Sequence, residues 1–353
     1  MTTLTVPARP EEDAGLRPLP WRRMAWVTWR QHRSTLAGVA VFLGAAAVCM
    51  AIAGDSLHHA YTAALAACHP ANSLACPNAV TAFDGRNGFL ANGIILQAVP
   101  VLIGAFAGAP VLARELETGT FRYAWTQGFG RWRWTLAKLV PLAATVAAAA
   151  GLFSLLLDWY YQPYFATVNP TWTLTEMSPF FPPLFDLRGI GFAAWTLAAF
   201  AIGALAGMLI RRVVPAIIAT LAVYTGLAFA AGGFLRMHYL TPVLTSSPNV
   251  PASAAVISQW WTKGGKFAFA GWPPDNLLDR YCANPAVGSA ITNGKPKVLT
   301  LVQCLNQHGY TQWTSYQPAS RFWPFQWIEG GWLLVLSVML IAAAVFLVHR
   351  RAA

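Results

Sequence analysis

Residues 189–235 have the sequence GIGFAAWTLAAFAIGALAGMLIRRVVPAIIATLAVYTGLAFAAGGFL. It contains two apolar runs, and its only charged residues are Arg211 and Arg212, which separate them. Each run has the roughly 20 apolar residues that an α-helix needs to cross about 30 Å of hydrocarbon. The stretch therefore predicts two membrane-spanning helices joined by a short basic turn.

Four more windows of this kind occur, and the six predicted spans are 35–54, 89–112, 136–160, 189–210, 213–235 and 328–348. The only charges inside the other windows are Lys138, Asp158 and Glu329, all near window ends. Such long, evenly apolar runs do not match the alternating ten-residue strands of a membrane β-barrel. The sequence predicts an all-α polytopic membrane protein with six transmembrane helices.

The composition leads to the same conclusion. Only 10% of the 353 residues are charged and 56% are hydrophobic, whereas a soluble domain carries about 25% charged residues. This composition excludes a soluble enzyme, and so many aromatic and aliphatic residues also exclude a disordered chain. We expect the chain to lie in a lipid bilayer.

Basic residues indicate the orientation. Of the 24 Lys and Arg residues, 15 fall on the side that holds both ends of the chain. Basic residues favour the cytoplasmic side, so both termini are predicted to be cytoplasmic. Residues 1–20 are polar and lack the apolar core of a signal peptide, and abundant Arg, Ala and Gly suggest a bacterial plasma membrane. The net charge of +11 is read as a topology signal that suits anionic lipid, and no nucleic-acid partner is expected.

The residues before the first span predict an amphipathic interfacial helix. Pro20 suits a first helical turn. The faces expected for this helix are an apolar one with Trp21, Met24, Ala25 and Thr28 and a basic one with Arg22, Arg23, Arg30 and Arg33. Anchoring at the membrane surface explains this pattern.

Four of the five cysteines fall on the predicted outer side, which is oxidising. They allow three pairings, and we favour Cys68 with Cys76 and Cys282 with Cys304 because each pair closes a local loop; unpaired thiols are the alternative. Close ligand spacing for zinc is missing, so no metal site is expected. The second pair would form a disulfide cross-link within an outer domain, 236–327, between spans five and six.

Catalytic motifs are missing from the sequence. Lys266 and Lys295 each follow a glycine but precede Phe267 and Pro296, so neither forms a P-loop, and HExxH and GxSxG do not occur. We therefore expect no catalytic residue and no bound cofactor on this chain.

The segment between spans two and three is the most informative. Its sequence over 108–127 is GAPVLARELETGTFRYAWTQ, which places Glu115 and Glu117 on an otherwise basic side. Glu115 either has a structural role, in which it caps helix dipoles or pairs with Arg114 or Arg122, or contacts another protein. A positive backbone φ is expected at Gly119, where the short helix should end.

This segment resembles the coupling region of permease subunits of type-2 ATP-binding-cassette (ABC) exporters. MAWVTWRQHR at 24–33, Arg211-Arg212 with Pro215, and YQPASRFWPFQWIE at 316–329 extend the resemblance, in particular to an actinobacterial subgroup. The resemblance implies a second permease copy, identical or related, and two separate ATPase subunits that bind ATP and Mg. It also implies ATPase-coupling residues within a loop at 113–135, namely Arg114, Glu115, Glu117, Gly119, Thr120 and Arg131.

In similar exporters spans two and five line the translocation path, which implies path residues Asn92, Gln97, Phe106, Thr220 and Tyr224 here. The expected domains are an N-terminal segment 1–34, spans one to five at 35–235, the outer domain 236–327, and the sixth span with its tail at 328–353. We expect outward transport of hydrophobic or amphipathic small molecules or lipids by alternating access, along a path without buried charges. The alternatives are a signalling or mechanotransmitting permease that transports nothing, and a membrane transferase acting on a lipid-linked substrate.

Overall fold

The computed structural model describes residues 21–69, 74–84, 89–119, 131–165, 178–247, 249–251, 253–282 and 298–351. Six helical segments within these residues are long and apolar enough to cross a membrane: Met24–Ala67, Gly93–Thr118, Trp132–Phe165, Gly191–Ile210, Val213–His238 and Ala319–Arg350. They coincide with the six predicted windows and extend most of them at one or both ends. The predicted fold class is confirmed.

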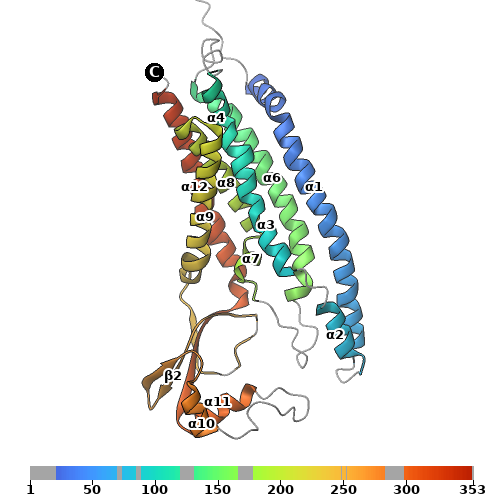
Figure 1. The fold of residues 1–353 in the computed structure, drawn as a ribbon, viewed down its shortest axis with the longest axis vertical. Helices are drawn as coiled ribbons and strands as arrows, with labels where there is room; N and C mark the ends of the chain where they lie inside the picture. The colour runs from blue at the N-terminus through green and yellow to red at the C-terminus, as the bar shows by residue number, and fades with distance from the viewer. Residues whose placement is uncertain are drawn as a thin grey trace, which may run out of the picture.

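The helices run roughly parallel along the long axis of the molecule (Figure 1). Four spans are single helices: α1 (Trp21–Ala67), α6 (Arg131–Phe165), α8 (Gly191–Ile210) and α12 (Phe322–Arg351). Span two consists of α3 (Phe89–Ile103), a π-helical turn η1 (Gly104–Gly108) and α4 (Ala109–Thr118). Span five consists of α9 (Val213–Ala230), η2 (Ala231–Leu235) and η3 (Arg236–His238). Short helices α2 (Cys76–Asp84), α7 (Pro182–Phe185) and η4 (Ala319–Arg321) lie at the end opposite the C-terminus.

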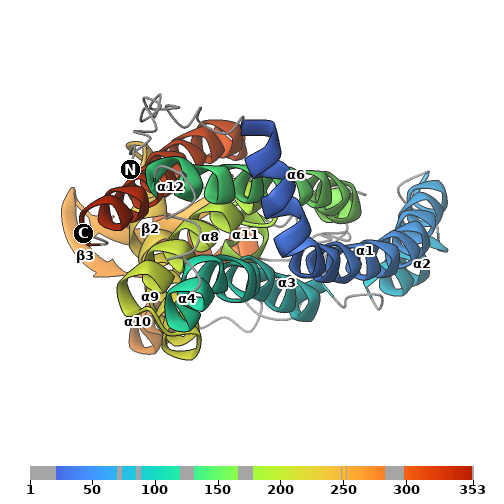
Figure 2. The same cartoon turned by 90° about the horizontal axis from the view of Figure 1, so that it is seen from above.

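The predicted interfacial helix and the first span form one continuous helix, α1, of 47 residues. At 1.5 Å per residue such a helix is about 70 Å long, more than twice the hydrocarbon thickness. Met24 and Thr28, from the predicted apolar face, are buried, and the Thr28 hydroxyl donates to the Ala137 carbonyl oxygen at 3.1 Å. Figure 2 shows the first turns of α1 lying across α6, at an angle to the rest of the helix. The apolar face therefore packs on the neighbouring span.

Helix α8 lies in the middle of the bundle and packs against α3, α4, α6, α9 and α12 (Figure 2). Its contact with span two is a direct approach of two backbones. A Cβ atom added at Gly203 would lie 2.3 Å from the Gly104 carbonyl oxygen, and one added at Gly207 would lie 2.3 Å from the Ala109 carbonyl oxygen. Glycine is the residue that permits this approach, so α8 and span two are in contact without intervening side chains.

A small domain connects spans five and six and lies beyond the end of the bundle opposite the C-terminus (Figure 1). It contains an antiparallel sheet of β1 (Val243–Thr245), β2 (Ala255–Lys263), β3 (Lys266–Ala270) and β4 (Tyr310–Gln317) in the order β1-β4-β2-β3, with helices α10 (Asp275–Cys282) and α11 (Val298–Gln307). The sequence did not locate these strands. We call this unit the sheet domain.

Both predicted disulfides are present. Cys282–Cys304 joins α10 to α11 inside the sheet domain, and Cys68–Cys76 closes the connection between α1 and α2. The predicted pairing is confirmed.

Candidate functional site

At the end of the bundle that carries the C-terminus, α4 forms the last turns of span two. Pro110 lies in its first turn, and its final residue is followed by Gly119 in the left-handed conformation, with φ of 72°. Glycine adopts this conformation without steric cost and commonly ends helices. The predicted positive φ at Gly119 is confirmed, and α4 is a short helix with a defined end.

Glu115 on α4 is buried and binds two other helices. The Lys138 ammonium group of α6 donates to its carboxylate, and the Gln31 side chain of α1 donates to the same oxygen at 2.6 Å. The Lys138 ammonium also lies 4.1 Å from the centre of the Trp134 ring. Of the basic residues considered as partners of Glu115, Arg114 has an exposed side chain, and Arg122 lies outside the described residues. The partners that the structure gives are Lys138 and Gln31. We call Glu115, Lys138 and Gln31 the inner triad.

The next carboxylate of α4 faces solvent. Glu117 accepts a hydrogen bond from the backbone N–H of Val213 at 3.0 Å. Val213 is the first residue of α9, so Glu117 caps the positive end of that helix dipole. Span two is thus connected at this end to α9 as well as to α1 and α6. Of the other predicted coupling residues, Thr120 lies outside the described residues, and Arg131 begins α6 with its side chain outside the description.

At the opposite end, a cavity of about 510 Å³ lies between span two and span five. Its walls come from α3, the 182–187 segment, α8, α9 and η2. They are mostly apolar, with aromatic residues from α8 and α9. The lining residues are Gln97, Ala98, Pro100, Val101, Pro182, Asp186, Leu187, Phe192, Trp195, Tyr224, Thr225, Ala228, Phe229, Gly232 and Gly233.

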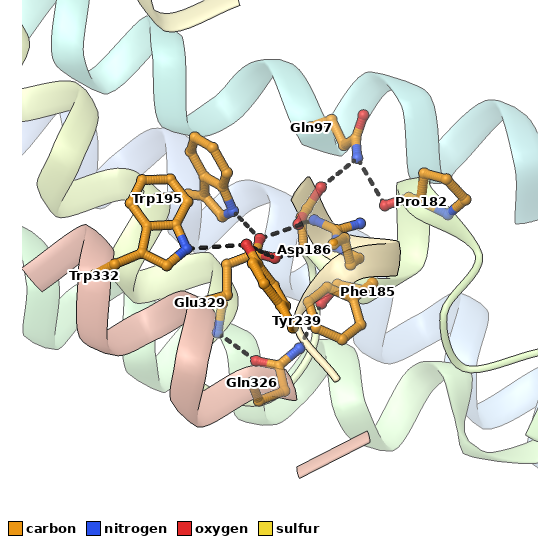
Figure 3. Close-up of polar contacts among 11 residues, drawn as sticks. Gln97, Pro182, Phe185, Asp186, Trp195, Tyr239, Gln326, Glu329 and Trp332 are labelled. Atoms are coloured by element: carbon orange, nitrogen blue, oxygen red, sulfur yellow. Dashed lines mark hydrogen bonds and ion pairs between the residues drawn. The ribbon is translucent and has the colours of Figure 1, made fainter. Parts of the chain in front are cut away.

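A cluster of buried charges lies beside this cavity (Figure 3). Arg236 of η3 and Glu329 of α12 are both completely buried. The Arg236 guanidinium donates to Glu329 through Nε at 3.0 Å and Nη2 at 2.8 Å, and Nη2 also contacts the Asp186 carboxylate. Its Nη1 atom is buried without a hydrogen-bond partner within the structure's described ranges. We call Asp186, Arg236 and Glu329 the outer charge cluster.

Neutral donors complete the hydrogen bonding of Glu329. The Trp195 indole N–H donates to it at 2.9 Å and the Tyr239 hydroxyl at 3.2 Å, while the Trp332 indole N–H donates to the Tyr239 oxygen at 2.9 Å. Buried charges are tolerated when they are paired and hydrogen-bonded in this way. Arg236 and Glu329 therefore form a neutral ion pair in which the Glu329 carboxylate is fully hydrogen-bonded and, among the described residues, Nη1 of Arg236 is not.

Asp186 differs from Glu329 because its side chain keeps 20% exposure. Within the described part of the chain, its hydrogen-bond donor besides Arg236 is Gln97, at 3.3 Å. Burial raises the pKa of Asp186 to about 7, an effect that Arg236 opposes and Glu329 reinforces. Burial, with the nearby Glu329 charge, also raises the pKa of Tyr239, so that hydroxyl stays protonated. When Asp186 is ionised, the outer charge cluster has a net charge of −1.

Only some of the predicted path residues that the structure describes line the cavity. Gln97 and Tyr224 both line the cavity. Thr220 is buried but donates to the Ala216 carbonyl oxygen of its own helix, and Phe106 is 60% exposed on η1. Asn92 lies in α3, with its side chain outside the description. The cavity is also lined by a charged, partly buried side chain, Asp186, whereas the predicted path was expected to hold no buried charge.

Sequence reasoning missed both charged groups, although signals for them were present. Lys138 and Glu329 lie inside apolar windows, and an ionisable residue in a membrane span generally needs a partner. The partners, Glu115 and Arg236, also lie at span ends. Asp186 gave no such signal, because it lies between spans.

Comparison with known proteins supports one family. Residues 40–236, more than half of the chain, match the family described as ABC-2 membrane transporter related. No curated protein and no solved structure matches the chain significantly. The match begins within α1 and ends at Arg236, so it includes most of span one, spans two to five, and both buried charge groups except Gln31 and Glu329. The chain therefore belongs to the ABC-2 membrane transporter related family.

Proposed function

We propose that the chain is one membrane half of an ATP-driven exporter that moves amphipathic small molecules or lipids outward by alternating access. Family membership makes it a membrane subunit of an ABC transporter, which works with an ATPase subunit. The observation that supports export is the cavity of about 510 Å³ between spans two and five. Its volume falls within the roughly 300–1,000 Å³ of small-molecule sites.

The geometry at the other end supports a coupling role for α4. The α4 helix is continuous with η1 and α3, whose Gln97 contacts the cavity. Glu117 links the end of α4 to the first residue of α9, whose Tyr224 lines the opposite wall. A displacement of α4 by an ATPase would therefore reach both walls of the cavity through rigid helices.

The assembly that we propose contains two ATPase subunits carrying ATP and Mg, and a second permease copy, identical or related. Both termini would lie in the cytoplasm of a bacterium, with the sheet domain outside the plasma membrane. The two disulfides are consistent with this orientation, because both lie at the sheet-domain end and disulfides persist in oxidising compartments. The coupling residues proposed are Arg114, Glu115, Glu117, Gly119, Thr120 and Arg131.

Transport is tested on the chain purified with the ATPase that assembles with it and reconstituted in proteoliposomes. ATP-dependent movement of a fluorescent amphiphile and its stimulation of ATP hydrolysis are measured together. Thr225→Trp, which fills the cavity, should lower both by at least 10-fold. Leu155→Trp, an equally large change on an exposed face of α6, should keep both. ATP hydrolysis without any movement of amphiphiles would contradict the export function.

Signalling or mechanotransmission is a second candidate, because the sheet domain is bonded to spans five and six. Gln317 donates to the Leu240 carbonyl oxygen at 2.7 Å, and Arg321 donates to the Thr241 carbonyl oxygen at 2.6 Å. Motion of these helices would be transmitted directly to the sheet domain. In that case Arg321→Ala should uncouple a response of the sheet domain while ATP hydrolysis continues, and no amphiphile should be transported.

A further inference from the structure

We infer that the cavity between spans two and five binds amphipathic organic cations, with the cationic group at Asp186 and the apolar body against the aromatic wall. This inference rests on the proposed export function and names its substrate class. It starts from the charges around the cavity. Arg236 supplies a single positive charge, and two carboxylates share it.

The hydrogen bonds show which carboxylate remains available. Glu329 receives two guanidinium donors, one indole donor and one hydroxyl donor, and is completely buried. Asp186 receives Arg236 and Gln97, keeps 20% exposure and lines the cavity. The surplus negative charge therefore lies at the cavity wall. No Lys or Arg is among the described residues that line the cavity.

The rest of the wall suits the apolar part of such a ligand. Phe192, Trp195, Tyr224 and Phe229 contribute aromatic surface, and Trp195 and Tyr224 pack edge-to-face with ring centres 5.5 Å apart. Aromatic faces attract organic cations, more strongly where water is excluded. An anion would meet the carboxylate of Asp186 and these electron-rich faces, so the same wall disfavours it.

The test compares two ions of the same size and shape and opposite charge, tetraphenylphosphonium and tetraphenylborate. Binding of each is measured separately to the full chain in phosphatidylcholine nanodiscs, with empty nanodiscs subtracted. The measurement is made at pH 8, because burial raises the pKa of Asp186 and an alkaline pH favours its ionised form. We expect the phosphonium ion to bind at least 10-fold more tightly than the borate, which is about 1.4 kcal/mol.

Three variants make the test specific. Asp186→Asn should weaken phosphonium binding at least 10-fold, and it should not weaken borate binding, because it removes a charge that repels the anion. Asp158→Asn removes a carboxylate that pairs with Arg188 and does not line the cavity, so it should change neither. Gly233→Leu should abolish phosphonium binding by filling the cavity, and an added Cβ there meets no atom within 4 Å, so this variant remains informative if Asp186→Asn does not fold.

The outcomes separate this inference from the export function. Equal binding of the two ions, or phosphonium binding that Asp186→Asn and Gly233→Leu leave unchanged, would overturn the cation site. Phosphonium binding that depends on Asp186, together with absence of ATP-driven transport, would support the site and contradict the exporter. Because binding is measured without the ATPase, the two results are independent.

Discussion

The ammonium group of Lys138 and the carboxylate of Glu115 form a buried ion pair between the start of span three and the end of span two. The two side chains keep 5% and 11% exposure. Both partners therefore depend on each other, and on Gln31, for compensation of their buried charge. This relationship ties α1, α4 and α6 together at the end where an ATPase would bind.

Lys138→Met should destabilise the chain because it leaves the Glu115 carboxylate buried and unpaired. Removing one partner of a buried pair costs about 3 to 5 kcal/mol, which should appear as a lower thermal unfolding midpoint in detergent. The double variant Glu115→Gln with Lys138→Met should recover most of this loss. Arg114→Gln, on the exposed side of the same helix, serves as the control. Equal midpoints for the single and double variants would show that the unpaired Glu115 carboxylate is not the cause of the loss.

Glu117→Ala should leave folding nearly intact, because an exposed carboxylate contributes well under 1 kcal/mol. We predict that the ATPase no longer co-purifies, since losing a charge that meets a buried basic group of a partner costs about 2 to 5 kcal/mol of the contact. Glu117→Gln keeps an acceptor for the Val213 N–H without the charge. If Glu117→Gln restores assembly, the role of Glu117 is to cap α9 and the charge is not needed.

Gly119→Val should reorient the end of α4, because a β-branched residue at φ of 72° is strained by about 1 to 3 kcal/mol. The variant should reach the membrane in normal amount but fail to assemble with the ATPase or to show substrate-stimulated turnover. Gly119→Asn is the matched control, since asparagine tolerates the left-handed region. Wild-type assembly in Gly119→Val would mean that this turn is ordinary surface.

Cys282→Ser should weaken the sheet domain. The disulfide closes a separation of 22 residues, and restricting the unfolded chain in this way contributes about 3 kcal/mol. Proteolysis within the sheet domain should therefore accelerate, while the membrane bundle stays resistant. Peptide mapping without reductant should recover the Cys282–Cys304 and Cys68–Cys76 pairs; free thiols at these positions in oxidised membranes would refute the assignment.

Stability should fall as the pH rises from 6 to 8. The pKa of Asp186 in the folded chain, about 7, lies above its ordinary value of 3.8, so its stabilising contribution is complete below the ordinary pKa and is lost as pH rises through about 7. The charged and titratable groups that face it are Arg236, Glu329 and Tyr224, and Gln97 donates a hydrogen bond to it. The expected loss is on the order of 1 kcal/mol, seen in the unfolding midpoint, and Asp186→Asn should remove it. A midpoint that falls equally in Asp186→Asn would assign the titration to another group.

The span positions could be predicted because each span has to supply about 20 apolar residues, and that requirement is local. The strands of the sheet domain could not. The expected signal for a strand is alternation of buried and exposed residues, but β2 buries only Ala255 and Trp261 along its length. The strand β2 forms because it pairs with β4, which begins about 50 residues later in the chain.

The candidate site was predicted in part for a related reason. Gln97 and Tyr224 were chosen because the resemblance assigned the path to their helices, and both line the cavity. The outer charge cluster joins Asp186, Arg236 and Glu329 from three separate segments. A single sequence gives no register between such segments, so the position of Glu329 inside an apolar window did not identify Arg236 or Asp186 as its neighbours.

The direct backbone contact between α8 and span two restricts how the cavity can change shape. Where Gly203 meets Gly104, separation of the two helices would leave a void that no side chain is available to fill, and such voids are costly. These two helices should therefore travel as a single rigid body through any working cycle. The freedom to widen or close the cavity then belongs to α9, on the other wall, and the hinge should lie in the turn at Arg211 and Arg212.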